Sequence, residues 1–333
     1  MRKFYTNVLS KSIRGIFALA LLGFFSCGKP PILINPENNP VESHLNSVIK
    51  VKYSSDGKLL ASGGNDSNII IWDGQSGRFL RRLDGRYDKI FDIAFVNSNN
   101  QVLTVNYQGT LLTWDVRRGI ETTRALYSNF IPGFDVNSEK GILIVPGWDT
   151  ALQVLSLADY TVLQNCKSAD YKIRAVKYSV KTNSVYGVTA GGNLLRWDLA
   201  DCSQGENFNR KIHDDAVTAI DIDDEANLLV SASVDSTVKL FSLDSLKEIA
   251  ILKEHKSSVN AVKIVASMSK MVSADKDGKI IVWDIRTLQP ITLAAFGDSI
   301  NSIDVSPDGR FIATGGNDKT IKLWSMAKIL STK

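Results

Sequence analysis

A chain of 333 residues, 44% of them apolar, is long enough for one large repeat-built core or for two ordinary domains. Its net charge of +4 comes from the N-terminal segment 1–26, which holds four basic side chains and no acid, so the remainder has 35 basic and 35 acidic residues. A neutral body lacks the basic surface of a DNA- or RNA-binding protein, which argues against that class.

Residues 1–26 have the layout of an export signal. A basic head precedes an uncharged apolar run, residues 15–25, which ends at Ser26 and Cys27. The run is shorter than the about 20 apolar residues of a membrane-spanning helix and has the proportions of a secretory signal. A small residue before a cysteine resembles a bacterial lipoprotein signal, which implies cleavage before Cys27 and lipid on its thiol. Two phenylalanines precede Ser26 and depart from the usual lipobox, so an ordinary cleaved signal and an uncleaved anchor remain alternatives. The expected location is the bacterial cell envelope, with the lipid in the outer membrane.

Residues 27–43 are expected to form an extended tether, because four of the chain's eight prolines fall there. Two further cysteines follow in the body of the chain, Cys166 and Cys202. An exported compartment would permit a disulfide between them. Two free thiols on outer strands are the alternative, and the sequence does not decide between these states.

The body repeats a motif that ends in Trp-Asp. Four copies are clear and end at Asp73, Asp115, Asp198 and Asp284, while weaker copies end at Ser156, Ser242 and Ser325. The anchor residues of the seven copies, spaced by 41 to 44 residues, are Trp72, Trp114, Leu155, Trp197, Phe241, Trp283 and Trp324. Repetition at such a period indicates a solenoid, a propeller or another array.

Within each copy, apolar residues recur at every second position. A β-branched residue lies 24 positions before every anchor: Val48, Ile90, Ile131, Ile173, Val217, Val259 and Ile300. This alternation is typical of a half-buried strand, and the turn sequences SSDG (54–57) and SPDG (306–309) predict hairpins. A third strand carries the anchor, and a fourth follows it, as at 78–83. The pattern predicts four antiparallel strands per copy and an all-β array.

These motifs resemble the WD-repeat family over residues 40–333, which implies a seven-bladed β-propeller. A single four-stranded sheet cannot bury both faces, whereas a closed ring lets every sheet pack on two neighbours. The repeats span about 44–73, 86–115, 127–156, 169–198, 213–242, 255–284 and 296–325, within a propeller domain of residues 44–333. Only nine residues follow Trp324, so residues 32–41 are expected to supply the outer strand of the seventh blade and close the ring. The prolines of that segment are acceptable in an edge strand.

Three histidines occupy equivalent places in three repeats. A serine, an aspartate and the anchor follow each of them at the same three offsets, as Ser62, Asp66 and Trp72 do in the first repeat. A catalytic triad would occur once, so this recurrence predicts a structural device. The resemblance implies a hydrogen-bonded tetrad of His, Ser or Thr, Asp and Trp, whose donors and acceptors suit one another. The expected members are His44, Ser62, Asp66, Trp72, His213, Ser231, Asp235, His255, Ser273, Asp277, Trp283, Thr314, Asp318 and Trp324. No catalytic residue, cofactor or metal site is expected, since His and Cys never cluster at ligand spacing.

Blades two to four depart from the tetrad pattern, at Arg86, Gln108, Tyr127, Val145, Leu155, Ala169, Gly187 and Gly191. Aromatic residues collect in the loops of the same blades, namely Trp148, Tyr107, Tyr127, Phe130, Tyr171 and Tyr87. The resemblance implies that these loops emerge on the face where WD-repeat proteins usually bind partners. Because Trp and Tyr bury large areas at low entropic cost, they are candidate contacts for a protein partner. The alternative is that they fill gaps left by the missing tetrads.

The sequence favours a non-catalytic scaffold for protein–protein contacts, a monomeric propeller held at the membrane by lipid on Cys27. An exported propeller enzyme, lactonase-like or quinone-dependent, is the alternative and would need convergent polar groups in its channel. The positions expected to face the channel are mostly small and uncharged: Gly133, Ala175, Ala219, Ala261 and Ser302. An accessory subunit of outer-membrane protein assembly is a further alternative, by analogy alone.

Overall fold

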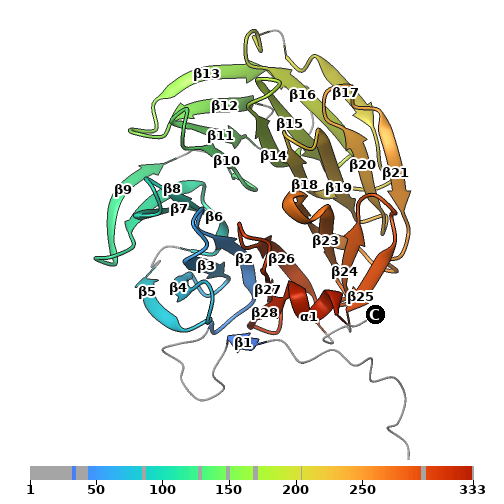
Figure 1. The fold of residues 1–333 in the computed structure, drawn as a ribbon. Helices are drawn as coiled ribbons and strands as arrows, with labels where there is room; N and C mark the ends of the chain where they lie inside the picture. Colours follow the sequence, from blue (N-terminus) through green and yellow to red (C-terminus); the bar gives the residue numbers. More distant parts are fainter. Residues whose placement is uncertain are drawn as a thin grey trace, which may run out of the picture.

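Seven four-stranded antiparallel sheets form a ring in the computed structural model (Figure 1). The structure describes residues 32–34, 44–84, 88–126, 130–147, 151–167, 172–203, 205–293 and 298–331. Strands adjacent in a sheet are also adjacent in the sequence, except in the seventh blade. The seven-bladed all-β propeller with four strands per blade is therefore confirmed.

The blades follow one another along the chain, each with its first strand beside the central channel and its last strand at the rim. Blades one to three comprise β2 (Val48–Tyr53), β3 (Leu59–Gly64), β4 (Asn68–Asp73), β5 (Phe79–Asp84), β6 (Ile90–Val96), β7 (Gln101–Asn106), β8 (Thr110–Asp115), β9 (Ile120–Leu126), β10 (Asp135–Asn137), β11 (Ile142–Pro146), β12 (Ala151–Ser156) and β13 (Val162–Lys167). Blades four and five comprise β14 (Ile173–Ser179), β15 (Ser184–Thr189), β16 (Asn193–Asp198), β17 (Phe208–Lys211), β18 (Val217–Asp223), β19 (Leu228–Ser233), β20 (Val238–Ser242) and β21 (Glu248–Leu252). Blade six comprises β22 (Val259–Val265), β23 (Lys270–Asp275), β24 (Ile280–Asp284) and β25 (Pro290–Leu293), with a 3₁₀ turn, η2 (Ala266–Met268), after β22.

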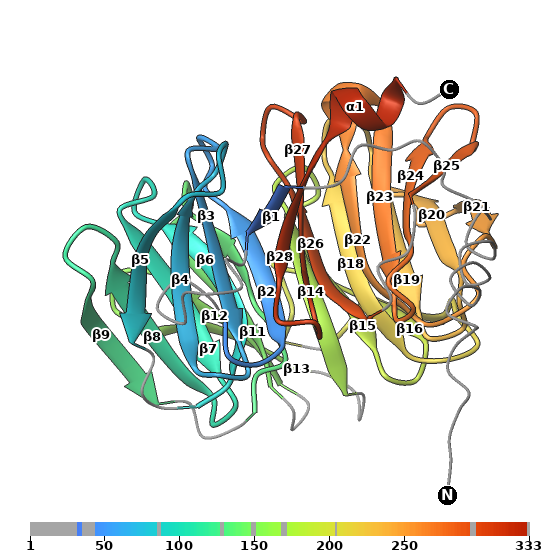
Figure 2. The same cartoon turned by 90° about the horizontal axis from the view of Figure 1, so that it is seen from below.

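The seventh blade is completed by the N-terminal segment. Its inner strands are β26 (Ile300–Val305), β27 (Phe311–Gly316) and β28 (Ile321–Ser325), and its outer strand is β1 (Ile32–Ile34). β1 lies antiparallel to β28, with Ile32 opposite Leu323 and Ile34 opposite Ile321 (Figure 2). After β28 the chain turns into a short helix, α1 (Met326–Leu330), so the C-terminus does not supply this strand. The expected closure of the ring by the N-terminal segment is confirmed.

The hydrophobic core lies between the sheets. Because side chains alternate along a strand, each sheet contributes apolar residues to both of its neighbours. In β4, Ile70 and Trp72 pack toward blade seven, whereas Ile69 and Ile71 pack toward blade two. Seven such buried clusters fill the seven interfaces between blades. The fold therefore depends on ring closure, since an open array would expose two of these faces.

The hairpins predicted at SSDG and SPDG connect β2 to β3 and β26 to β27. Gly57 and Gly309 adopt φ angles of 70° and 72° there, in the left-handed region that glycine enters without strain. The serine that opens each turn accepts the backbone N–H of the first residue of the next strand, through Ser54 to Leu59 and through Ser306 to Phe311. Both turns follow the inner strand of their blade, so they lie at the end of the propeller opposite the loops that lead from one blade into the inner strand of the next.

Candidate functional site

The constellation around His44 is a buried hydrogen-bond chain in blade one. The Trp72 indole N–H donates to Ser62 Oγ over 2.9 Å, Ser62 Oγ lies 2.8 Å from His44 Nε2, and His44 Nδ1 lies 3.0 Å from Asp66. The acceptor-only carboxylate fixes the direction: Nδ1–H donates to Asp66, so Nε2 of the neutral imidazole accepts from the serine hydroxyl, whose oxygen in turn accepts from the indole. Burial raises the pKa of Asp66, but hydrogen bonds from His44 and from the Leu45 and Asn68 N–H groups outweigh it and lower the pKa to about 2.

Blade five repeats the chain without an indole. His213 Nε2 lies 2.8 Å from Ser231 Oγ, and its Nδ1 lies 2.9 Å from Asp235. Phe241 occupies the anchor position and is fully buried, so its ring supplies packing but no donor. Burial lowers the pKa of His213 despite the neighbouring carboxylate, which keeps the imidazole neutral and able to accept from the serine. These hydrogen bonds join the segment before β18 to β19 and to the turn after β19, and so stabilise blade five internally.

Blade six uses a different aspartate from the one expected. Trp283 Nε1–H donates to Ser273 Oγ at 2.9 Å and His255 Nε2 lies 2.7 Å from the same oxygen, but His255 Nδ1 bonds Asp275, at 2.7 Å, and not Asp277. The carboxylate at the end of β23 is buried and already beside the ring, whereas Asp277 is exposed in the turn. Asp275 also accepts the N–H groups of Asp277 and Lys279 and so caps the loop.

The choice of aspartate follows from the residue two positions after the serine. In blade one that residue is Gly64 and in blade five it is Ser233, and neither offers a carboxylate. The aspartate four positions after the serine then reaches the imidazole. In blade six the residue two positions after the serine is Asp275, and its carboxylate bonds the imidazole in place of the aspartate four positions after the serine.

Blades seven and two retain only part of the chain. The Trp324 indole donates to Thr314 Oγ1 at 3.2 Å, and the Trp114 indole donates to Thr104 Oγ1 at 3.3 Å. Asp318 accepts the N–H and hydroxyl of Thr320, at 3.0 and 2.7 Å, together with the ammonium of Lys322. Burial raises the pKa of Asp318, but these hydrogen bonds outweigh it and lower the pKa. Asp318 thus organises a loop of the seventh blade.

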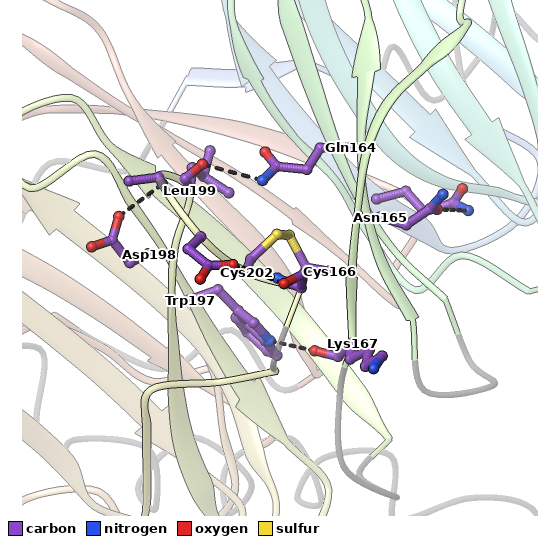
Figure 3. The surroundings of a disulfide bond; sticks show 12 residues. Gln164, Asn165, Cys166, Lys167, Trp197, Asp198, Leu199 and Cys202 are labelled. Atoms are coloured by element: carbon purple, nitrogen blue, oxygen red, sulfur yellow. Dashed lines mark hydrogen bonds between the residues drawn. A yellow bond between two sulfur atoms is a disulfide. The ribbon is translucent and has the colours of Figure 1, made fainter.

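Blade four lacks the internal hydrogen-bond chain and instead makes hydrogen bonds with blade three. A Cβ atom at Gly187 would lie 2.7 Å from Trp197 Cζ3, so the indole occupies the space that a serine would need. The indole N–H points out of the blade and donates to the Lys167 carbonyl oxygen on β13, over 2.8 Å (Figure 3). Gln164 Nε2 also donates across this boundary, to the Leu199 carbonyl oxygen at 3.2 Å. Gly187 is therefore a site of close packing.

A disulfide reinforces the same boundary. Cys166 on β13 is bonded to Cys202, with the two Cα atoms 4.8 Å apart (Figure 3). Cys202 lies in the loop between β16 and β17 and not on an outer strand, and both cysteines are buried. Of the two states left open by the sequence, the structure has the disulfide. It joins the rims of blades three and four covalently.

Charged residues of alternating sign line the central channel. They fall in one column, four positions after the β-branched residue of each inner strand, which reads in chain order Lys52, Ala94, Asp135, Lys177, Asp221, Lys263 and Asp304. Ammonium and carboxylate groups of adjacent blades pair at 2.7 Å in Lys177–Asp135, 3.0 Å in Lys263–Asp221 and 3.5 Å in Lys52–Asp304. The last pair joins the seventh blade to the first.

The carboxylates also satisfy backbone groups. A blade's inner strand is an edge of its sheet, and its outward N–H groups have no partner within that sheet. The preceding blade's aspartate accepts one of them in three places: Asp304 from Tyr53 at 2.8 Å, Asp221 from Ile264 at 2.9 Å and Asp135 from Tyr178 at 2.9 Å. Burial raises the pKa of Asp221, but Lys263 and Lys177 outweigh it and lower the pKa. The channel's charges therefore hold neighbouring blades together.

The expectation that the channel is lined mainly by small uncharged residues is wrong. The five small residues do border a cavity of about 240 Å³, together with Lys52, Lys177, Asp221, Lys263 and Asp304. Alternate residues of a strand point the same way, so the column two positions further along each strand also faces the channel. Lys50 and Asp92, in the column of the small residues, form a further pair at 3.0 Å. Asp92 in addition accepts the Phe134 N–H at 3.1 Å.

Three aromatic rings form a cluster at the channel mouth. Phe91 borders the cavity, and its ring centroid lies 5.8 Å from that of Tyr107 and 5.0 Å from that of Phe130. The Tyr107 and Phe130 centroids are 5.6 Å apart. Tyr107 is 56% exposed, whereas the other two rings are half-buried. The structure thus brings together two predicted contact residues, Tyr107 and Phe130, and adds Phe91. The sequence feature that could have revealed Phe91 is its position directly before Asp92, which faces the channel.

Several predicted residues lie outside the described part of the chain: Cys27, Tyr87, Tyr127, Trp148 and Tyr171. Among the described residues, no group of three or more His, Cys, Asp or Glu side chains gathers as a metal site. Those same residues include no helix long and apolar enough to cross a bilayer.

Four segments, residues 38–73, 207–242, 246–284 and 290–325, match the family model described as WD domain, G-beta repeat. The chain is a seven-bladed β-propeller that contains four WD repeats. The matched WD repeats are blades one, five and six, which retain the histidine, and blade seven, which retains the bond from Trp324 to Thr314. Blades two to four fall outside the match, although blade two keeps the bond from Trp114 to Thr104.

Known proteins similar to this chain come from several eukaryotes. It is 22% identical to Autophagy-related protein 16 of Arabidopsis thaliana over 87% of the chain and 50% of that protein. It is 25% identical to WD repeat-containing protein 1 of Gallus gallus, over 86% of the chain and 48% of that protein. Identity to the Serine-threonine kinase receptor-associated protein of Dictyostelium discoideum is 21%, over 89% and 99%. The chain spans about half the length of the first two relatives.

Proposed function

We propose that the protein is a non-catalytic scaffold that binds a protein partner at its channel mouth. The observation that carries this proposal is the aromatic cluster of Phe91, Tyr107 and Phe130, with Tyr107 more than half exposed. Aromatic side chains of this kind are the usual anchors of protein interfaces. The similarity to WD-repeat proteins such as the receptor-associated protein of Dictyostelium discoideum supports a role in protein association.

The state of the channel carboxylates supports a scaffold over an enzyme. Each of Asp92, Asp135, Asp221 and Asp304 pairs with a lysine and also accepts a backbone N–H of the neighbouring blade. A general base or a nucleophile must instead have free lone pairs directed at a substrate. These carboxylates are engaged in holding the ring together.

The proposal includes export and a lipid anchor on Cys27. The N-terminal sequence carries the argument, and the disulfide supports it, because disulfides persist mainly in oxidising compartments such as the periplasm. The anchor is tested by Cys27→Ala in cells labelled with a radioactive fatty acid. The lipid proposal expects loss of label and accumulation of the uncleaved precursor, and a variant that is still labelled and processed would rule it out.

Partner binding is tested by crosslinking and pull-down from envelope membranes. Tyr107→Ala should lose the crosslinked partner and leave the unfolding midpoint unchanged, since the ring is mostly exposed. Leu163→Ala is the matched control, because Leu163 is 59% exposed but lies on the outer strand β13. Equal capture by both variants would refute the assignment of the partner to the channel mouth.

A further inference from the structure

The charges at the channel are unequal in number. Five cations border the cavity or pair with its lining, namely Lys50, Lys52, Arg174, Lys177 and Lys263. The carboxylates number four, and each is paired with one lysine: Asp92, Asp135, Asp221 and Asp304. Of these five cations, Arg174 is the one that has no carboxylate partner among the described residues. Its guanidinium leaves the cavity with an excess of positive charge.

The ionisable groups of the channel act on one another in both directions: burial lowers the pKa values of Lys177 and Lys263, but neighbouring carboxylates outweigh it and raise them, whereas the pKa of Lys52 is lowered. Asp304 raises the pKa of Lys52, but burial and the lysines across the channel, Lys263 and Lys177, together lower it. Cations repelling one another across a partly enclosed space favour the entry of an anion. An added carboxylate at the mouth would relieve that repulsion.

Arg174 borders the same cavity as Phe91 of the aromatic cluster. Phe91, Pro132 and Arg174 occupy the same column in blades two, three and four, directly after the β-branched residue of each repeat. All three border the cavity, and Arg174 is exposed. The mouth therefore offers an apolar wall in blades two and three and a guanidinium in blade four. A guanidinium suits the bidentate binding of a carboxylate.

We propose that the channel mouth selects a partner segment in which an Asp or Glu lies next to an apolar side chain. The carboxylate pairs with Arg174, and the apolar side chain packs against Phe91 and Tyr107. An acidic side chain suffices for this, because Arg174 is exposed at the channel mouth and the lysines inside the channel already have carboxylate partners. No chain terminus therefore has to enter the channel. This inference rests on the proposed scaffold function and gives the chemistry of its partner.

A phage library of random dodecapeptides, with their C-termini fused to the coat protein, tests the proposal. The library is selected in parallel on the wild-type protein, on Arg174→Gln and on Arg117→Gln. Arg117 is also an exposed arginine, on the turn between β8 and β9 and outside the residues that border the channel cavity. The wild type and Arg117→Gln should enrich acidic residues beside aliphatic or aromatic ones. Arg174→Gln should lose the acidic enrichment, with Arg174→Lys intermediate and all unfolding midpoints equal.

The most enriched peptide is then measured by calorimetry beside its Asp→Asn form. We expect at least tenfold weaker binding for the Asn form on the wild type, and no difference between the two forms on Arg174→Gln. Selection of neutral peptides that need Tyr107 would overturn this inference and keep the scaffold function. Enrichment only of peptides indifferent to both Tyr107 and Arg174, or of none, would overturn both. A peptide that binds only with a free C-terminal carboxylate would overturn the assignment to an internal acidic side chain.

Discussion

Replacing Gly187 by serine asks whether blade four lacks a tetrad or has exchanged it for another arrangement. Serine is the residue that blades one, five and six carry in this column. If position 187 merely lacked that serine, restoring it should stabilise the blade. The structure gives the opposite expectation, because a Cβ atom there would lie 2.7 Å from Trp197 Cζ3 and 3.1 Å from Cη2. The indole would have to move away from its present position.

The cost has two parts. Forcing an extra group into a filled core costs about 1–3 kcal/mol, and an indole that moves loses its bond to the Lys167 carbonyl oxygen, about 0.5–1.5 kcal/mol. Together these lower the free energy of unfolding by ~2–4 kcal/mol. With an unfolding entropy of roughly 2.1 cal/mol/K per residue over residues 44–333, the expected fall in Tm is roughly 3–7 °C.

Thermal unfolding followed by circular dichroism measures this difference. Gly187→Ala should cost a similar amount, because the Cβ atom alone makes the clash. Gly191→Ala is the control in the same blade, where a Cβ atom would meet Thr189 Oγ1 at 3.6 Å and should leave Tm unchanged or slightly raised. A stabilised Gly187→Ser variant, or a harmless Gly187→Ala, would refute the reasoning.

Three further predictions concern other links in the ring. Cys166→Ser with Cys202→Ser removes a crosslink across 36 residues and should lower the free energy of unfolding in urea by about 3–4 kcal/mol, and a loss that reductant reproduces in the wild type would support it. Asp304→Asn removes the ion pair to Lys52 and should cost about 1–3 kcal/mol, with faster hydrogen exchange at the boundary of blades seven and one; a uniform increase around the ring would contradict this. The pKa of Asp66 is depressed from 3.8 to about 2, so its contribution of about 2 kcal/mol is present above pH ~4 and is lost as pH falls toward 2. Asp66→Asn should therefore differ from the wild type at pH 7 and converge with it near pH 2, and a pH-independent difference would count against the assignment.

The repeat period and the alternation of apolar residues were sufficient to predict the fold. Both properties follow directly from the geometry of strands, so anchors such as Trp72 and first-strand residues such as Val48 could be placed from spacing alone. Ring closure was predictable because Trp324 leaves too little chain for another strand. These features depend on local periodicity and on the number of strands.

The site was less predictable because its contacts join different blades. Asp277 fitted the column of the aspartates, but the nearer Asp275 reaches the imidazole, and only the path of the turn decides between them. Gly187 read as a missing serine, although the space is filled by Trp197 turning toward blade three. The alternating charges of the channel are visible in the sequence once the column is chosen. The choice of column requires knowing that two positions of each inner strand face the channel.

The bond between Cys166 and Cys202 makes one stretch of backbone dispensable as a covalent connection. The polypeptide between these residues and the disulfide form two parallel paths from blade three to blade four. A protease that cuts the chain once between them therefore leaves two fragments that are still joined, and the ring keeps its remaining links. A nicked molecule would migrate as a single species without reductant and as two with it. A cut in the link between any other two blades leaves only non-covalent contacts to hold the ends.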